Sequence, residues 1–301
     1  MTHPPRKLAF VIAATDHGTM IVSRFDEHRL ADNLGFGVGF QLLDTASYDQ
    51  SDVALLLTVL DLRRRYHGDG VVAVDCGANI GVQTVEWAKH MTSWGVVVAI
   101  EAQERIYHAL AGNLAINNCF NARAIHAAVT SAPGSMKIPN PNYLAPASFG
   151  SLELKKRDEP EFIGQDIDYS EGKMVDVHAI TLDAFNFPRL DLIKIDVEGM
   201  ELDALAGATK CIATHRPILL IEAIKVDGAK LRAVLESWNY SVVTSGINVL
   251  AMAKKLREKH HLVIDPGYGK LRGQTFRLSN MGDETEETVS HLLACLDDCL
   301  V

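Results

Sequence analysis

The chain has 301 residues, a formal net charge of −9 and 48% hydrophobic residues, which are ordinary values for a globular enzyme with a sizeable core. The acidic balance argues against a nucleic-acid surface, because phosphate binding relies on an excess of Lys and Arg. No apolar run approaches the ~18 residues of a membrane span. Five cysteines occur without paired spacing, so neither a zinc site nor a disulfide framework is predicted, and a cytoplasmic location fits best.

The N-terminal part, residues 1–69, is predicted to form a hairpin and a helix that lead into the core. Residues 8–25 indicate two strands around a turn at 16–18, and residues 51–66 have the period of a helix. The apolar run 8–14 is minimal for a signal peptide and has no clear cleavage site, so an N-terminal strand is the preferred interpretation.

From residue 70 onward, apolar strands alternate with amphipathic helices, which predicts a mostly parallel, doubly wound α/β sheet. The predicted strands are 71–75, 96–101, 123–129, 190–196, 218–224 and 240–244, and the predicted helices are 81–92, 104–118, 199–213 and 227–238. Residues 130–173 interrupt the rhythm with a segment rich in Pro, Asn, Ser and Gly. This segment is expected to be a loop or short hairpin over the site, where substrate selectivity often lies.

The first strand, turn and helix of this core predict a nucleoside cofactor. The strand ends at Asp75, the turn runs from Gly77 to Gly81, and Glu101 ends the next strand 20 residues later, a spacing suited to holding a ribose diol. A dinucleotide site favours G-x-G-x-x-G around its pyrophosphate, whereas the acid at Asp75 repels phosphate and suits a cation. S-adenosylmethionine has a ribose, an ammonium and a sulfonium but no phosphate, so it is the predicted cofactor.

The strand at 190–196 places charged side chains at the same edge of the sheet. Alternation along the strand puts Lys194, Asp196 and Glu198 on one face, which is costly unless the charges are paired or used. Lys194 can be a buried cation neutralised by Asp196 or Asp75. Glu222 ends the neighbouring strand and is expected at the same edge, either as a functional group or as a partner of Lys194.

The end of the core predicts one strand that runs against the others. Residues 240–244 and 247–251 are joined by Ser245 and Gly246 only, a connection that permits a hairpin but not a parallel crossover. A terminal antiparallel strand is typical of the class I methyltransferase sheet and is not expected in a simple dinucleotide-binding domain.

The ordered motifs VDCGANIGVQT, AIEA, TLDAF, IKIDVEGMELDALAGA and RPILLIEA resemble the FkbM family of S-adenosylmethionine-dependent methyltransferases over residues 70–253. The resemblance implies a class I Rossmann-like fold and methyl transfer to a hydroxyl of a sugar, glycolipid or polyketide-type acceptor. It also implies that the cofactor site is formed by Asp75, Gly77, Asn79, Gly81, Glu101 and Ala102. Asp196 and Glu198 are expected at the edge where the methyl group is transferred.

A carboxylate is the simplest general base for a weakly acidic hydroxyl. Glu198 and Asp196 are the first candidates and Glu222 is the third, while His126 and His178 are rivals. Asp196 and Glu198 also suit a magnesium ion, but no further ligand is evident and no metal is predicted. A small hydroxylated acceptor is the expected partner, without nucleic acid or membrane, and a homo-oligomer is compatible with the sequence. Two other classes stay open: a nicotinamide-dependent oxidoreductase, and an idle binding or fusion module.

Residues 254–301 resemble the end of class V pyridoxal-phosphate aminotransferases. The shared pattern is Gly269, Gly273, Phe276, Arg277, Met281 and Gly282. The large domain and lysine of that family are absent from this sequence, so transamination is not inferred. The segment is expected to be a small α/β tail, with an apolar helical stripe that packs on the core or on a partner.

Overall fold

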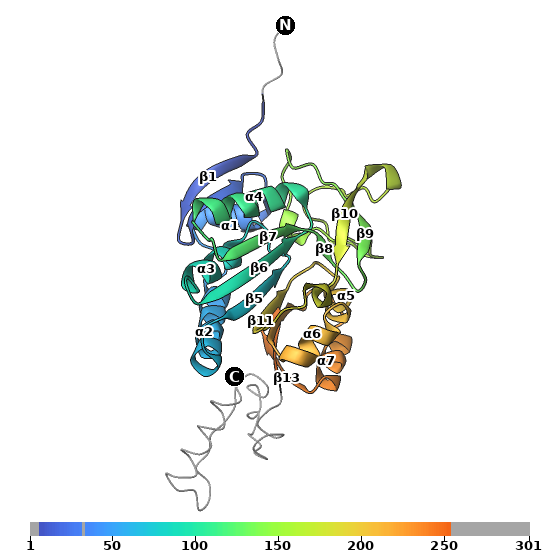
Figure 1. Cartoon of the computed structure of the whole chain (residues 1–301). Coiled ribbons are helices and arrows are strands. Elements are labelled where there is room, and N and C mark those ends of the chain that lie inside the picture. The colour runs from blue at the N-terminus through green and yellow to red at the C-terminus, as the bar shows by residue number, and fades with distance from the viewer. Residues whose placement is uncertain (1–5, 32–33, 254–301) are drawn as a thin grey trace, which may run out of the picture.

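The computed structural model describes residues 6–31 and 34–253, and its centre is a seven-stranded sheet (Figure 1). The strand order is β13-β14-β12-β11-β5-β6-β7. The strands are β5 (Val71–Cys76), β6 (Gly95–Glu101), β7 (Ala122–His126), β11 (Leu192–Ile195), β12 (Ile218–Glu222), β13 (Tyr240–Ser245) and β14 (Asn248–Ala253). The five strands from β12 to β7 are mutually parallel, as the alternating sequence predicts.

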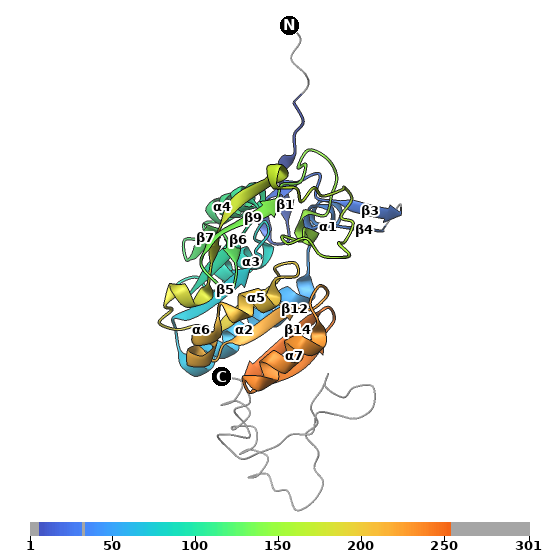
Figure 2. The same cartoon turned by 90° about the vertical axis from the view of Figure 1, so that its right-hand side faces the viewer.

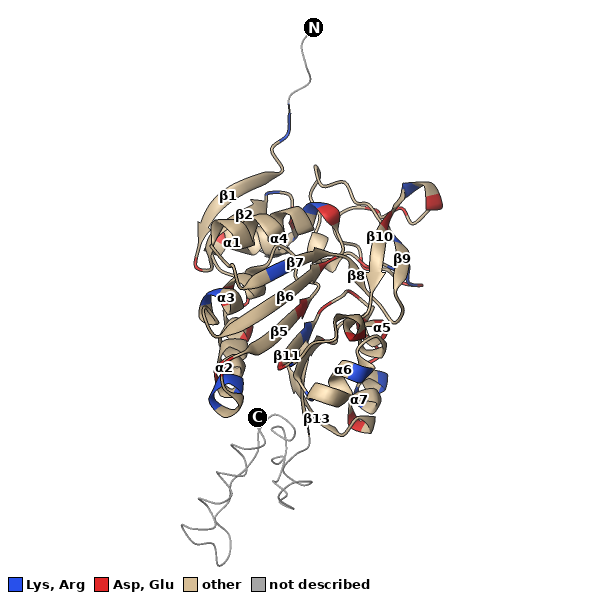
Figure 3. Ribbon diagram, in the orientation of Figure 1, with Lys and Arg blue, Asp and Glu red and all other residues tan. Residues whose placement is uncertain are grey.

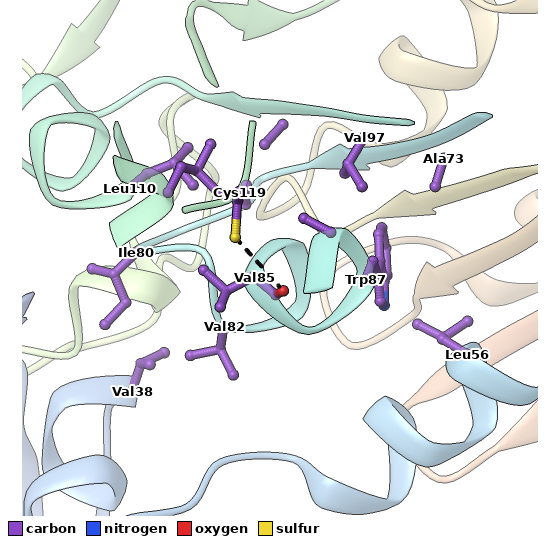
Figure 4. Close-up of a cluster of buried hydrophobic side chains, with 14 of the residues drawn as sticks. Val38, Leu56, Ala73, Ile80, Val82, Val85, Trp87, Val97, Leu110 and Cys119 are labelled. Carbon is purple, nitrogen blue, oxygen red and sulfur yellow. Dashed lines mark hydrogen bonds between the residues drawn. The ribbon is translucent and has the colours of Figure 1, made fainter. Parts of the chain in front are cut away.

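Helices cover both faces of this sheet (Figure 1). On one face lie α2 (Gln50–His67), α3 (Val82–His90) and α4 (Glu104–Ile116), and on the other lie α5 (Glu201–Ala206), α6 (Thr209–His215) and α7 (Gly228–Ser237). All six residues of β5 are buried, with Val71 and Ala73 in one apolar cluster and Val72 and Val74 in the other. Figure 4 shows side chains of α2, α3 and β6 in the first cluster. Two-sided burial explains why the central strands are continuous apolar runs.

The predicted antiparallel strand is β14. It pairs antiparallel with β12 on one side and with β13 on the other. The hairpin between β13 and β14 turns at Gly246, which has a left-handed φ of 58°. The prediction of a class I methyltransferase sheet with one reversed strand is therefore confirmed.

The region after β7 differs from the prediction. The expected strand 123–129 is interrupted at Ala127, and β8 (Ala128–Val129) leaves the main sheet to join β9 (Gly134–Pro139) and β10 (Met174–Ile180) in the order β8-β10-β9. The strand β10 was not predicted, because Asp176 and His178 break its apolar pattern. The 3-10 turns η1 (Phe149–Ser151) and η2 (Glu171–Lys173) lie in the connecting segment, and η3 (Leu182–Phe185) follows β10.

The predicted helix 199–213 is two helices, α5 and α6. They separate at Gly207, where an added Cβ would lie 2.0 Å from the carbonyl oxygen of Thr130. The backbone of the segment after β8 therefore lies against the break between the two helices, where only a residue without a side chain fits.

The N-terminal hairpin is confirmed as β1 (Phe10–Thr15) and β2 (Gly18–Ser23). The structure adds β3 (His28–Ala31), β4 (Leu34–Phe36) and α1 (Val38–Thr45), which were not predicted and which Figure 2 shows beside the loops that follow β9. No helix among the described residues is long and apolar enough to cross a membrane. The expectations for the tail fall on residues 254–301, outside the described part of the chain.

Candidate active site

A cavity of about 400 Å³ lies at the carboxyl ends of the parallel strands β5, β6, β11 and β12. Ligands bind at this edge in open α/β sheets. Of the predicted site residues, eight line the cavity: Asp75, Gly77, Asn79, Glu101, Ala102, Asp196, Glu198 and Glu222. Gly81 does not line it. Figure 3 shows acidic positions beside a basic one where β5 and β11 run next to each other.

The glycine turn after β5 is held in a shape that side chains would prevent. An added Cβ on Gly77 would lie 1.7 Å from the carbonyl oxygen of Asp196, and one on Gly81 would lie 2.5 Å from Leu110. Both glycines have left-handed φ values, 77° and 89°. Between them Asn79 is also left-handed, with its side-chain oxygen accepting a hydrogen bond from the Ile80 amide at 2.7 Å. Gly81 thus allows the turn to pack closely against α4, and it does not form part of the cavity surface.

Glu101 is buried at the end of β6 and is held by backbone donors. Its two oxygens accept hydrogen bonds from the amides of Asn79 at 3.0 Å and Gln103 at 2.8 Å. Burial raises the pKa of Glu101 to about 7. A carboxylate has about four acceptor positions, so these two hydrogen bonds leave room for a hydroxyl donor. This arrangement fits the predicted ribose contact.

Asp75 at the end of β5 has one satisfied and one unsatisfied oxygen. Thr84 donates a hydrogen bond to Oδ2 at 2.6 Å, whereas Oδ1 is buried, has no hydrogen-bond partner among residues 6–31 and 34–253, and lies 3.9 Å from the Lys194 ammonium. Burial raises the pKa of Asp75. A buried carboxylate oxygen that lacks a donor, in a residue of the cavity lining, fits a cationic ligand, and it does not fit a phosphate. The residues of this end therefore suit S-adenosylmethionine.

Three carboxylates meet in the part of the cavity lining that follows β11 and β12, which is called the outer end below, and the part formed by Asp75, Glu101 and the glycine turn is called the inner end. Asp196, Glu198 and Glu222 each place a carboxylate oxygen within 4.8 Å of the other two. The strand β11 ends at Ile195, so Glu198 reaches the cluster from a left-handed turn with φ 54°, not by strand alternation. The predicted convergence on one edge holds, although the backbone that produces it differs.

Two lysines already neutralise part of this cluster. Lys194 donates a hydrogen bond to Asp196 at 3.0 Å, which confirms that Lys194 is paired. Lys225, which is 8% exposed, donates to Glu198, to the Ser151 carbonyl at 2.7 Å and to Glu161 at 2.9 Å. These three contacts use all the donors of one ammonium group.

Glu222 differs from the other two acids because no hydrogen bond or ion pair is recorded for its side chain within the described chain. Burial, together with the negative charge of Asp196, raises the pKa of Glu222 to about 8. Its expected pairing with Lys194 is not formed as a direct contact. Three clustered carboxylates can also hold a divalent cation, but the two lysines already neutralise the charges of Asp196 and Glu198.

The histidine rivals lie outside the cavity lining. The ring of His126 lies 3.0 Å from the Ala102 carbonyl oxygen and stacks on Tyr107, and His178 is exposed on β10. Neither contacts the carboxylate cluster. Both positions match the surface or strand-edge roles that were the alternative to catalysis.

Much of the cavity wall comes from residues that sequence reasoning did not name, although the insertion at 130–173 was expected to lie over the site. These are the N-terminal residues Phe36, Gly37, Val38, Gln41, Tyr48 and Asp49, the insertion residues Ser148, Gly150, Ser151, Leu152, Leu154 and Glu161, and Gln83, Ile224, Lys225 and Ile247. Asp26 links the N-terminal segment to the insertion, since its carboxylate accepts hydrogen bonds from the amides of Gly39 and Phe149, both at 2.9 Å. The sequence signal for such a link is weak, because the buried Asp26 follows no motif.

The chain was compared with known proteins. A family model described as the methyltransferase FkbM domain matches residues 75–242, and no curated protein is a significant match. One similar solved structure is methyltransferase FkbM from Methylobacillus flagellatus, with 19% identity, a TM-score of 0.43, and 71% of this chain and 57% of that chain covered. The chain thus spans little more than half of that protein.

Two other structures show more distant likeness. The O-methyltransferase TomG from Streptomyces achromogenes has 12% identity and a TM-score of 0.41, with 69% of this chain and 81% of that chain covered. Magnesium protoporphyrin IX methyltransferase from Synechocystis has 12% identity and a TM-score of 0.39, with 73% and 86% covered. The family model spans more than half of the 301 residues. The chain belongs to the FkbM methyltransferase family, whose methyl donor is S-adenosylmethionine.

Proposed function

We propose that this protein transfers a methyl group from S-adenosylmethionine to a hydroxyl of a small acceptor, of the sugar, glycolipid or polyketide type. The observation that carries the proposal is the convergence of Asp196, Glu198 and Glu222 at one end of the cavity whose other end suits the cofactor. An unactivated hydroxyl needs a base within reach, and this cluster supplies one.

The inner end of the cavity holds the cofactor in the proposal. Glu101 accepts hydrogen bonds from the ribose hydroxyls, Asp75 faces the positive charge through its unpaired oxygen, and the Gly77 turn lets the backbone approach closely. Bound S-adenosylmethionine supplies a methyl group on a positively charged sulfur, which leaves as a neutral thioether. The protein then has to align the acceptor and exclude water.

Glu222 is the base that the contacts favour. Asp196 and Glu198, the first candidates from sequence, are each bonded to a lysine, so an ammonium group already occupies part of each carboxylate. Burial nevertheless raises the pKa of Glu198 well above its usual range, so the choice of Glu222 rests on its lack of such a contact. Glu222 has a pKa of about 8 and no direct cation partner in the described chain, so its affinity for a proton is matched to neutral pH. The acceptor hydroxyl gives its proton to the Glu222 carboxylate as the oxygen bonds to the methyl carbon. Lys194 and Lys225 keep the neighbouring acids in place.

The rim of the cavity favours an acceptor that has an apolar part and no phosphate. Phe36, Ile224 and Ile247 line the cavity and are 48%, 58% and 54% exposed. Acidic residues outnumber lysines in the lining, so a negatively charged acceptor is repelled. Glycolipids and polyketide-type alcohols therefore match this surface better than phosphorylated sugars do.

The test is incubation with methyl-labelled S-adenosylmethionine and matched acceptors, followed by mass spectrometry. The panel pairs alkyl glycosides with the corresponding sugar phosphates and adds polyketide-type alcohols and their amine analogues. We expect the label as a methyl ether on an uncharged hydroxyl compound. Label on nitrogen only, or a preference for the phosphorylated member of each pair, would contradict the proposal.

A further inference from the structure

Lys225 joins three segments of the chain at the outer end of the cavity. It lies in the loop between β12 and α7 and is buried. Its ammonium group donates to the carboxylate of Glu198 in the loop after β11, and in the insertion to the Ser151 carbonyl at 2.7 Å and to Glu161 at 2.9 Å. A buried ammonium is costly unless such partners surround it. The three segments are therefore fixed to one another through a single charge.

The insertion segment that Lys225 contacts forms one side of the cavity. Residues 148–161, which are called the insertion wall below, contribute six residues to the cavity lining. A second cation, the exposed Lys155, also fixes this wall, because it contacts Asp203 on α5. Lys155 is not part of the cavity lining, whereas Lys225 is. Of these two cations, only Lys225 holds the insertion wall from inside the site.

The other lysine of the site, Lys194, has different partners. It donates to Asp196, which directly follows β11, and it lies 3.9 Å from Asp75 on β5. Within the described part of the chain, no hydrogen bond or ion pair joins Lys194 to the insertion wall. Lys194 therefore neutralises acids of the central sheet, whereas Lys225 ties an acid of the cluster to the insertion wall.

The place of Lys225 in the chain also links the insertion wall to the proposed base. Glu222 ends β12, and Lys225 follows it by three residues. We propose that Lys225 is a positioning residue, which holds the insertion wall against the carboxylate cluster so that the acceptor hydroxyl lies within reach of Glu222. This inference rests on the proposed function, and it adds a residue that neither takes the proton nor binds the cofactor.

The proposal is tested by comparing Lys225→Met with Lys155→Met, which removes a cation from the same insertion wall without touching the carboxylate cluster. Turnover is measured with S-adenosylmethionine and octyl β-D-glucopyranoside, an alkyl glycoside, and the cofactor site is probed by calorimetry with S-adenosylhomocysteine, the demethylated product. For Lys225→Met we expect kcat/KM for the glycoside to fall about 10- to 100-fold, because a misplaced wall misaligns the acceptor. Affinity for S-adenosylhomocysteine should be unchanged. Lys155→Met should match the wild type in both measurements.

The division of the loss between kcat and KM separates positioning from general damage. A smaller fraction of folded protein lowers the apparent kcat alone, whereas a displaced insertion wall also raises KM for the glycoside. We therefore expect Lys225→Met to raise this KM as well as to lower kcat.

Hydrogen exchange tests the same claim without an acceptor. In the complex with S-adenosylhomocysteine, the amides of the insertion wall should exchange about tenfold faster in Lys225→Met than in the wild type, while those of β5 stay unchanged. Lys225→Met leaves Glu198 as a buried acid without its cation, which can prevent folding. The double variant Lys225→Met/Glu198→Gln removes the whole ion pair and should show the same faster exchange.

The proposal is overturned if exchange of the insertion wall is unchanged in Lys225→Met and in the double variant. It is also overturned if Lys225→Met and Lys155→Met lose kcat/KM equally, or if affinity for S-adenosylhomocysteine falls as much as turnover. If the wild type methylates neither octyl β-D-glucopyranoside nor any other alcohol of the panel, the proposed function fails, and hydrogen exchange alone decides whether Lys225 holds the insertion wall.

Discussion

The two ends of the cavity hold their carboxylates in different ways. At the inner end, Glu101 is bonded to two backbone amides and Asp75 to a threonine hydroxyl. The Lys194 ammonium lies 3.9 Å from the other oxygen of Asp75 without a hydrogen bond to it. At the outer end, Asp196 and Glu198 are bonded to the ammonium groups of buried lysines. Neutral donors fix an acid in place and leave its charge for a ligand. Ammonium donors neutralise the acid, which is why we propose Glu222, the carboxylate that remains free at the outer end, as the group that moves a proton.

The largest expected effect is loss of that free carboxylate. Glu222→Gln keeps the shape of the side chain but cannot take a proton, so turnover should fall by about 10²–10⁴, while cofactor affinity stays nearly constant. The control is Glu161→Gln, which removes a half-exposed acid that contacts Lys225 at the same rim. Steady-state rates on the acceptor found by the labelling screen decide the matter. Equal losses of turnover in both variants would show that Glu222 is not the general base.

The same comparison predicts the pH dependence of turnover. A base acts in its deprotonated form, and the pKa of Glu222 is raised to about 8, so kcat should rise about tenfold per pH unit below that value and level off above it. The midpoint belongs to the coupled carboxylate cluster, not to a single isolated group. Glu222→Gln should abolish the rise. A rate that is flat between pH 6 and 8 in the wild type would contradict the assignment.

A smaller effect should follow from adding a side chain to the glycine turn after β5. Gly77→Ala places a Cβ 1.7 Å from the Asp196 carbonyl oxygen at a left-handed φ, and such backbone strain costs about 1–3 kcal/mol even before the contact is relieved. The melting temperature and the cofactor affinity should both fall. Gly172→Ala, with nothing within 4 Å of its added Cβ, is the control. A Gly77→Ala protein that melts with the wild type would show that the turn is not tight.

The smallest effect concerns metal removal. Because Lys194 and Lys225 neutralise Asp196 and Glu198, turnover after treatment with a chelator should change by less than about twofold. The rate is measured before and after dialysis against the chelator, with added magnesium as the restoring control. Loss of activity that magnesium restores would contradict this account and would show that a bound metal ion assists the reaction.

The inner end was accessible to sequence reasoning because its parts are close together in the chain. Asp75, the glycine turn and Glu101 lie within 27 residues, and two-sided burial of β5 leaves a readable apolar run before the acid. The hairpin of β13 and β14 was also readable, since a connection this short permits one topology only. These local features fixed the sheet and its site edge.

The outer end could not be predicted in the same way, because its contacts join distant segments. Lys225 donates to Ser151, 74 residues away, and Asp26 accepts from Phe149, 123 residues away. Nothing in the periodicity of α1 or β10 indicates which partner they pack against. The choice of Glu222 over Glu198 likewise depends on where one lysine lies, and a single sequence does not contain that information.

The central claim is that the inner end is built for S-adenosylmethionine. Its most direct test is calorimetry of S-adenosylhomocysteine and NAD⁺ with the wild type and with Glu101→Ala. The account predicts that the wild type binds S-adenosylhomocysteine in preference to NAD⁺. Removing the buried acceptor should weaken S-adenosylhomocysteine by about 10- to 150-fold, the equivalent of about 1.5–3 kcal/mol. Tighter binding of NAD⁺, or equal binding of S-adenosylhomocysteine by wild type and variant, would contradict it.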